Sequence, residues 1–136
     1  MKIVVLGAGE SGVGAALLGQ KLGYEVRVSD KSEIKEKYKN VLNKAGIDWE
    51  EKGHNAAFLD HPDMVVKSPG IPSQIPVISD LVVKGAEVVS EIEFASRHTK
   101  GKIIAITGTN GKTTTTGLIH HIFAKAGKDV AMVGNI

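Results

Sequence analysis

The chain has 136 residues, enough for one domain of ordinary size, and its 42% hydrophobic and 24% charged residues are typical of a globular protein. Its formal net charge of +2, spread along the sequence, argues against nucleic acid as a partner. The lack of cysteine excludes disulfides, thiolate metal sites and cysteine nucleophiles, and agrees with a cytoplasmic location.

The first half of the chain predicts alternating strands and helices. Residues 2–6 are a β-branched run ending in glycines, which predicts a buried strand and is too short for a signal peptide or a membrane span. Residues 13–21 have helical spacing, and Gly23 stands where a helix C-terminal glycine belongs. Residues 25–30 predict a second strand. Residues 34–45 predict a helix whose lysines face solvent.

The second half continues this alternation. Residues 64–66 form another apolar run that predicts a strand. Three prolines within residues 68–76 forbid a helix and predict a rigid loop. Residues 77–84 then predict a helix, and residues 86–89 predict a strand.

A capping box is predicted where the next helix begins. Ser90 can cap that helix, while Glu93 returns a hydrogen bond to the Ser90 amide, so a structural role is favoured for the acids here. Residues 102–107 and 129–133 predict two further strands on either side of a last helix.

The alternation predicts an α/β fold with a mostly parallel sheet and right-handed crossovers. A polar, basic stretch at residues 94–101 predicts a domain boundary. Residues 1–94 would form a Rossmann-like nucleotide-binding domain. Residues 95–136 would hold only the first β-α-β of a phosphate-loop domain.

The sequence GAGESG follows the first predicted strand and opens a helix, as in dinucleotide-binding folds. Gly7 permits the tight turn, Gly9 lets the backbone approach a pyrophosphate, and Gly12 allows close packing of helix on strand. Asp30, at the end of the second strand, can bind ribose hydroxyls or a base edge. Glu10 is expected to face solvent, because it would repel a phosphate. The motif leaves the identity of the nucleotide open.

The sequence GTNGKTT lies between a predicted strand and the last helix, where a phosphate-binding loop belongs. Backbone amides of residues 108–113 can cradle a triphosphate, Lys112 can reach its outer phosphates, and the Thr113 hydroxyl can coordinate magnesium. Ile106 stands where the usual pattern has its first glycine, so only the GKT end matches strictly. No acid follows at a strand end that would complete a magnesium site.

Taken together, the motifs resemble the Mur ligase family. They are GAGESG at 7–12, SPGI at 68–71, SEIEF at 90–94, ITGTNGKTT at 106–114 and GNI at 134–136. The resemblance covers the whole chain, but only the front part of that family's enzymes.

The resemblance implies a cytoplasmic, three-domain enzyme of peptidoglycan synthesis. In it, ATP phosphorylates the L-alanine carboxylate of UDP-N-acetylmuramoyl-L-alanine, and the amine of D-glutamate attacks the acyl phosphate to form an amide. Asn110 favours this D-glutamate-adding branch, because the branch that adds L-alanine usually has histidine there. Further magnesium ligands and the glutamate-binding groups come later in the family's sequences. This polypeptide alone is therefore expected to be inactive.

The resemblance also implies roles for single residues. The glycine loop would hold the diphosphate, Asp30 and Lys31 the uracil, and Asn135 the UDP-sugar. The implied substrate-binding residues are Gly7, Gly9, Glu10, Ser11, Gly12, Asp30, Lys31, Gly70 and Asn135. ATP would contact Gly108, Thr109, Asn110, Gly111, Lys112, Thr113 and Thr114. Of these, Lys112 would stabilise the transferred phosphoryl group as a catalytic residue, and Thr113 would contact Mg²⁺.

Two other classes of function fit part of the sequence. A non-catalytic regulatory module could bind NAD or NADH through GAGESG and Asp30, but this leaves GTNGKTT unexplained. An NAD-dependent dehydrogenase would need a substrate domain with a proton-transfer residue, which the sequence does not supply.

Overall fold

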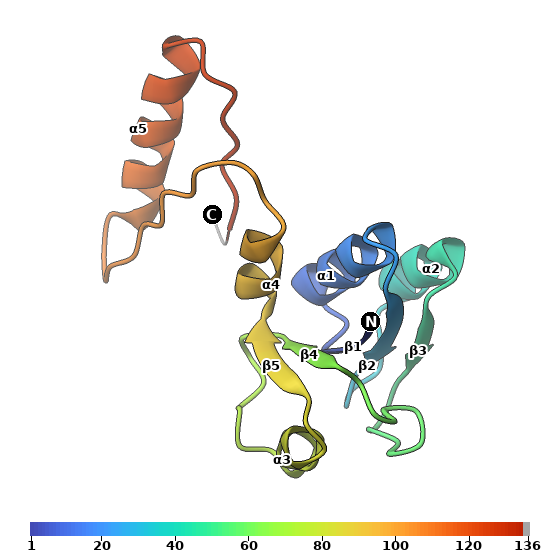
Figure 1. Cartoon of the computed structure of the whole chain (residues 1–136). Coiled ribbons are helices and arrows are strands. Elements are labelled where there is room, and N and C mark those ends of the chain that lie inside the picture. Colours follow the sequence, from blue (N-terminus) through green and yellow to red (C-terminus); the bar gives the residue numbers. More distant parts are fainter. Residues whose placement is uncertain (135–136) are drawn as a thin grey trace. The chain divides into compact units, whose positions relative to one another are not determined.

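A computed structural model describes residues 1–134 of the chain. The chain divides into two compact units, Met1–Thr99 and Lys100–Ile136 (Figure 1). The first contains a parallel sheet with helices on both faces, and the second contains one long helix. No helix within residues 1–134 is both long enough and apolar enough to cross a bilayer.

The sheet of the first unit has five parallel strands in the order β3-β2-β1-β4-β5. This confirms the predicted α/β class. The strands are β1 (Lys2–Leu6), β2 (Glu25–Ser29), β3 (Asp48–Glu50), β4 (Met64–Lys67) and β5 (Glu87–Ser90).

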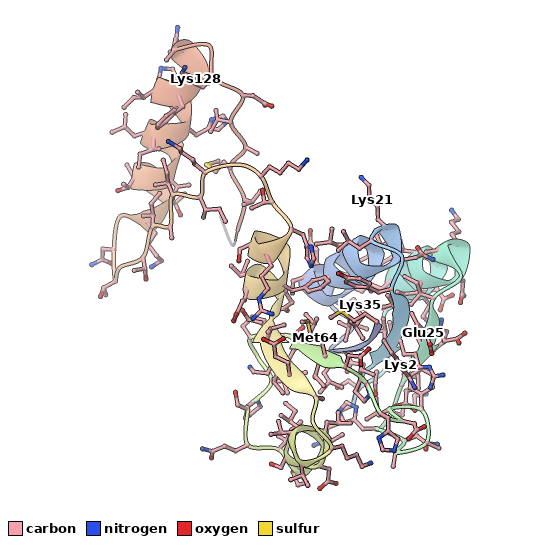
Figure 2. All side chains as sticks on the ribbon, viewed as in Figure 1. Lys2, Lys21, Glu25, Lys35, Met64 and Lys128 are labelled. Atoms are coloured by element: carbon pink, nitrogen blue, oxygen red, sulfur yellow. The ribbon has the colours of Figure 1, made fainter. Side chains whose placement is uncertain are left out.

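Four helices belong to the first unit: α1 (Glu10–Lys21), α2 (Glu36–Ala45), α3 (Pro76–Val83) and α4 (Glu91–Arg97). Gly23 lies just beyond α1 with φ +80°, as its position predicts. Pro76 opens α3, where its missing N–H leaves no intrahelical bond unmade. Lys21 projects from the end of α1 into solvent (Figure 2).

The core forms two layers because side chains alternate between the faces of a strand. Ile3 and Val5 of β1 pack with residues of α1, α2 and α4 on one face. Val4 and Leu6 pack with α3 on the other face. Figure 1 shows α3 on the opposite side of the sheet from α1 and α2. All four side chains are fully buried, so β1 is the centre of the fold.

The edge strand β3 was not predicted from the sequence. Its three residues pair with β2 in register, with Trp49 opposite Val28. Trp49 packs against the core and donates a hydrogen bond from Nε1 to Asn43 Oδ1 at 2.8 Å. Two of the three residues of β3 are acids, so it lacks the apolar run that predicted the other strands.

The second unit consists of α5 (Lys112–Lys125) between two extended segments. The strands predicted at residues 102–107 and 129–133 are not formed within the described part of the chain. A strand requires a neighbour to pair its backbone N–H and C=O groups, and neither segment forms such a ladder. Helix α5 has no buried residue.

Candidate functional site

The strand order places a topological switch point at the carboxyl ends of β1 and β4. The chain proceeds from β1 outward to β2 and β3, then crosses back to β4 and β5 on the other side of β1. At such a switch point the connections leave in opposite directions, and open α/β sheets bind ligands there. The glycine loop follows β1 and the SPGI turn follows β4, so two motifs distant in sequence reach the same edge.

Gly7 and Gly12 are required by packing within the glycine loop. Gly7 has φ +96°, and a Cβ added to it would stand 2.7 Å from Ser68 Oγ and 3.3 Å from Ile71 Cδ1. A Cβ added to Gly12 would overlap the carbonyl oxygen of Gly7. The loop is thus pressed between the first turn of α1 and the SPGI turn.

Gly9 differs from these two glycines because an added Cβ would meet no atom within 4 Å. It is the N-cap of α1 with φ −76°, and no side chain caps this helix. The amides of the first turn therefore have no side-chain acceptor. Glu10 begins α1 and is exposed, as predicted.

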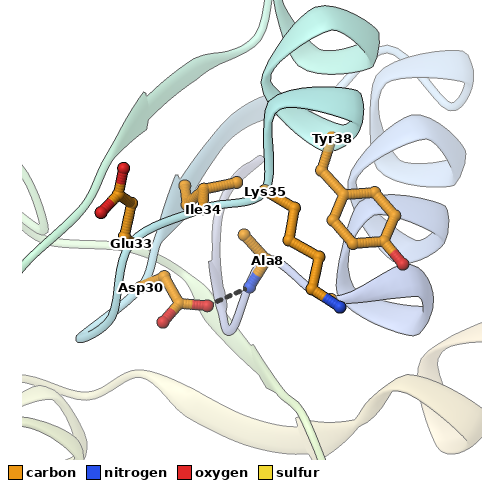
Figure 3. A pocket seen from close by; sticks show the side chains of 7 residues that line it. Ala8, Asp30, Glu33, Ile34, Lys35 and Tyr38 are labelled. Atoms are coloured by element: carbon orange, nitrogen blue, oxygen red, sulfur yellow. Dashed lines mark hydrogen bonds between the residues drawn. The ribbon is translucent and has the colours of Figure 1, made fainter.

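Asp30 joins the glycine loop to the loop after β2. Its Oδ2 accepts a hydrogen bond from the Ala8 amide at 2.7 Å (Figure 3), and its Oδ1 accepts one from the Ser32 amide at 2.8 Å. Both carboxylate oxygens therefore already have a backbone donor. The neighbouring Lys31 is exposed and does not line the adjacent pocket.

That pocket, of about 200 Å³, lies beside the glycine loop and the start of α2. Figure 3 shows Lys35 extending past Ala8, with Tyr38 next to it. The lining residues are Ala8, Gly9, Asp30, Glu33, Ile34, Lys35 and Tyr38. Sequence reasoning did not select Lys35 or Tyr38, because lysines on α2 were assigned to solvent and Tyr38 has the spacing of a core residue.

Glu51 holds the loop before α2, whose residues Glu33, Ile34 and Lys35 line this pocket. Glu51 Oε2 accepts a hydrogen bond from the Ile34 amide at 2.8 Å and pairs with Lys39 Nζ at 3.0 Å. The Ile34 amide and then Lys39 lower the pKa of Glu51. The bond to Glu51 in turn raises the pKa of Lys39.

The SPGI turn is fixed by a lysine that sequence reasoning also missed. Lys67, the last residue of β4, donates from Nζ to the carbonyl oxygen of Ile71 at 2.8 Å. The Ser68 amide donates to Leu6 O at 3.0 Å. Gly70 is exposed, and a Cβ there would meet no atom within 4 Å, so this side of the turn is open.

The segment SEIEF has a different structure from the predicted capping box. Ser90 caps α4 as predicted, accepting from the Glu93 amide at 3.1 Å. The carboxylate of Glu93 accepts from Arg97 at 2.7 Å instead of returning to Ser90, because Arg97 lies one turn further along the same helix face. Glu91 is buried and accepts a hydrogen bond from Ser11 Oγ at 2.8 Å.

In the second unit, residues 108–111 form a loop that leads into α5, and residues 112–114 are the first residues of that helix. Gly111 is the N-cap of α5 with φ +76°, and no side chain caps this helix. The ammonium of Lys112 donates to the carbonyl oxygens of Gly108 and Thr109, the latter at 3.3 Å. The remaining predicted ATP contacts are exposed: Asn110, Thr113 and Thr114.

The donor set of this loop fits a phosphate chain better than a complete magnesium site. Free amides at a helix N-terminus and an ammonium group favour an anion. Thr113 offers one hydroxyl oxygen, and no group of three or more His, Cys, Asp or Glu residues able to hold a metal occurs among residues 1–134. Asn135, predicted to contact the UDP-sugar, lies outside the described residues.

Two family descriptions match the chain. Residues 1–90 match the description Mur ligase MurD-like, N-terminal domain. Residues 106–136 match the Mur ligase middle domain. The first match alone covers more than half of the chain.

Curated relatives align with almost the whole chain. The UDP-N-acetylmuramoylalanine–D-glutamate ligase of Bacteroides fragilis is 56% identical over 135 residues, which are 99% of this chain and 30% of that protein. The protein of the same name from Exiguobacterium sibiricum is 40% identical over 135 residues, which are also 99% of this chain and 30% of that protein. The chain thus spans about 30% of the length of the curated relatives it matches.

Solved structures show the same likeness in three dimensions. A murein peptide ligase from Psychrobacter arcticus matches with a TM-score of 0.68 and 34% identity, covering 93% of this chain and 27% of that one. UDP-N-acetylmuramate-alanine ligase from Thermotoga maritima matches with a TM-score of 0.65 and 28% identity, covering 93% of this chain and 30% of that one.

Proposed function

The chain belongs to the Mur ligase family, and from this membership we propose that it is the N-terminal part of a ligase adding D-glutamate to UDP-N-acetylmuramoyl-L-alanine. Relatives named for this reaction are 40% to 56% identical to the chain, whereas the two solved sibling ligases are 28% and 34% identical. The difference supports the D-glutamate-adding branch. We assign residues 1–94 to the UDP-substrate domain and residues 95–136 to the start of the central ATP-binding domain.

The observation that carries the proposal is the packing of Gly7 against Ser68 at the switch point. It brings together GAGESG and SPGI, two of the motifs that resemble the family, at one edge of the sheet. In our proposal the diphosphate of the substrate lies against Gly9 and the amides of Glu10, Ser11 and Gly12 at the start of α1. The absence of any atom near a Cβ at Gly9 supports this, because a phosphate needs that space.

The nucleoside end of the substrate is assigned to the loop after β2, where Asp30 lines the adjacent pocket and Lys31 is exposed beside it. We propose that Asp30 and Lys31 bind the uracil, and that Gly70 lies beside the UDP group. Asp30 keeps further lone pairs on its oxygens after accepting the bonds from Ala8 and Ser32. The pocket beside Ala8 offers the volume for a ring.

ATP and Mg²⁺ are assigned to the second unit. The bound ATP supplies the phosphoryl group that converts the substrate carboxylate to an acyl phosphate. In our proposal Gly108, Thr109, Asn110, Gly111 and Thr114 bind the phosphate chain, and Lys112 stabilises the transferred phosphoryl. Thr113 contributes one hydroxyl to Mg²⁺. The uncapped start of α5 supports an anion at this loop.

Lys112 must leave its present partners to take this role. Its ammonium now donates to carbonyl oxygens of residues 108 and 109, which lie in the same loop. A phosphate is a stronger partner for an ammonium than a carbonyl oxygen, because the hydrogen bond is then formed between two charges. Exchange of partners is therefore expected when a triphosphate binds.

Calorimetric titration of the chain with UDP-N-acetylmuramoyl-L-alanine and, separately, with NADH tests the proposal. Binding of the UDP substrate without binding of NADH is the expected result. Tight NADH binding without UDP-substrate binding would overturn it and favour the NAD(H)-binding regulatory module. The two hypotheses share the GAGESG loop and Asp30, which follows β2, so only the ligand distinguishes them.

A further inference from the structure

Glu91 is a buried acid beside the proposed diphosphate site. It is 6% exposed, and with Ser29 it makes up the buried polar residues of the described chain. Burial of a carboxylate is costly unless hydrogen bonds compensate it. The Ser29 hydroxyl has polar partners in Glu50 Oε1 and His54 Nδ1, at 2.7 Å each.

The partner of Glu91 is Ser11, in the first turn of α1. Ser11 Oγ donates to Glu91 Oε1 at 2.8 Å, joining residues 80 positions apart. Ser11 is exposed while Glu91 is buried, so the bond connects the surface of α1 to a buried carboxylate. A hydroxyl has one proton, and Ser11 therefore cannot donate to a phosphate while it donates to Glu91.

This bond matters because the first turn of α1 has little other side-chain support. Gly9 is its N-cap, and no side chain accepts from the free amides. The carboxylate of Glu10, the preceding residue, is exposed. Among the described side chains of this turn, Ser11 is thus the one tied to another element of the fold.

We propose that Glu91 is a positioning residue for nucleoside diphosphate binding: it holds Ser11 Oγ and thereby fixes the α1 amides that receive the diphosphate. The inference rests on the proposed function, because it concerns the proposed diphosphate site. The role of Ser11 is then to link α1 to Glu91, and its backbone amide is the part that contacts the ligand.

If Glu91 only stabilised the packing of α4, any variant that weakens α4 should also raise the Kd for UDP. Ser90 provides the matched control, because its hydroxyl caps α4 through the Glu93 amide and forms no bond to α1. Ser90→Ala should lower the urea midpoint and leave the Kd for UDP unchanged. It therefore separates weakening of α4 from loss of the Ser11–Glu91 bond.

The test measures the Kd for UDP by calorimetry and the urea midpoint for five variants. They are Ser11→Ala, Glu91→Ala, Glu91→Gln, the double variant Ser11→Ala/Glu91→Ala, and Ser90→Ala. Ser11→Ala and Glu91→Ala should each raise the Kd about tenfold, and the double variant should be no weaker than the weaker single variant. Glu91→Gln keeps an oxygen that accepts from Ser11, so its Kd should stay within about threefold of wild type.

Wild-type affinity in both Ser11→Ala and Glu91→Ala would overturn the inference, as would additive losses in the double variant. If Glu91→Ala does not fold, Ser11→Ala and Glu91→Gln still decide, because Ser11→Ala removes the same bond from the exposed side. Failure of the wild-type chain to bind UDP would overturn the proposed function together with the inference. UDP binding by wild type with unchanged variants would overturn the inference alone.

Discussion

Gly12 lies directly against the carbonyl group of Gly7, so that an added Cβ would overlap the Gly7 oxygen and stand 3.0 Å from its carbon. The contact sets how closely α1 approaches the end of β1. We expect Gly12→Ala to lower the free energy of unfolding by about 1–3 kcal/mol, as overpacking of a core does. Urea unfolding followed by circular dichroism measures this.

Gly14 provides the control for helix propensity. It lies two residues further along α1, where an added Cβ meets no atom within 4 Å. Gly14→Ala should therefore stabilise the protein by about 0.5–1 kcal/mol, because alanine has the higher helix propensity. Equal stability of the Gly12→Ala variant and wild type would contradict the close approach of Gly12 to Gly7.

Unlike Gly12→Ala, Gly9→Ala should weaken UDP binding with little effect on stability. Its backbone φ of −76° is accessible to alanine, and the added methyl group meets no protein atom. The free energy of unfolding should fall by no more than about 1 kcal/mol, the cost of replacing glycine by alanine at an N-cap. The same methyl group would occupy the space assigned to the diphosphate, so the Kd for UDP should rise at least about tenfold. A Gly9→Ala variant that binds UDP like wild type would place the diphosphate elsewhere.

The order of elements in the first unit could be predicted from local sequence because apolar runs and glycine positions are local signals. The run at Lys2–Leu6 and the glycine at position 23 both carry such signals, and both predictions are confirmed. The strand β3 (Asp48–Glu50) could not be predicted in this way. It exists because β2 offers it an unpaired edge, which is a tertiary effect.

Part of the candidate site could be predicted because its residues belong to a local sequence motif. Gly7, Gly12 and Asp30 belong to a motif with fixed spacing, and the structure brings them together. Glu91 and Tyr38 reach the same region from other elements, and no spacing rule connects them to the glycine loop. Their positions follow from the packing of α2 and α4 against α1.

Low pH should lower the stability of the protein by protonating Glu51, which accepts a hydrogen bond from the Ile34 amide. Its pKa is lowered from the usual 4.5, first by the Ile34 amide and then by Lys39. The stabilisation by this carboxylate is therefore complete above about pH 4.5 and is lost as the pH falls through its lower folded-state pKa. Between about pH 6 and pH 3, wild type should lose more stability than Glu51→Gln, which cannot titrate.

Urea midpoints measured across that pH range check this prediction. Glu25→Gln is the matched control, because Glu25 is an exposed acid that pairs with Arg27 at 3.2 Å on the surface. It should keep the pH dependence of wild type. Identical pH profiles for wild type and Glu51→Gln would show that the bond to Ile34 contributes nothing to stability.

Residues 1–136 alone should not form the amide bond. Thr113 offers a single oxygen to Mg²⁺, and the part of the chain that the structure describes has no cluster of acids to complete the site. Incubation with UDP-N-acetylmuramoyl-L-alanine, ATP, Mg²⁺ and D-glutamate, followed by chromatography, should give no product above a protein-free blank. Detectable amide product from this polypeptide would contradict the prediction.

The binding of UDP at the switch point between β1 and β4 is tested most directly by amide chemical shifts. We predict that UDP titrated into the ¹⁵N-labelled chain shifts the amides of residues 8–12 and 30–38 and those of Ser68, Gly70 and Ile71, which meet at the carboxyl edge of the sheet. The amides of α3 serve as an internal control, because that helix packs on the opposite face from α1. Unchanged amides at residues 8–12 under saturating UDP would contradict the account.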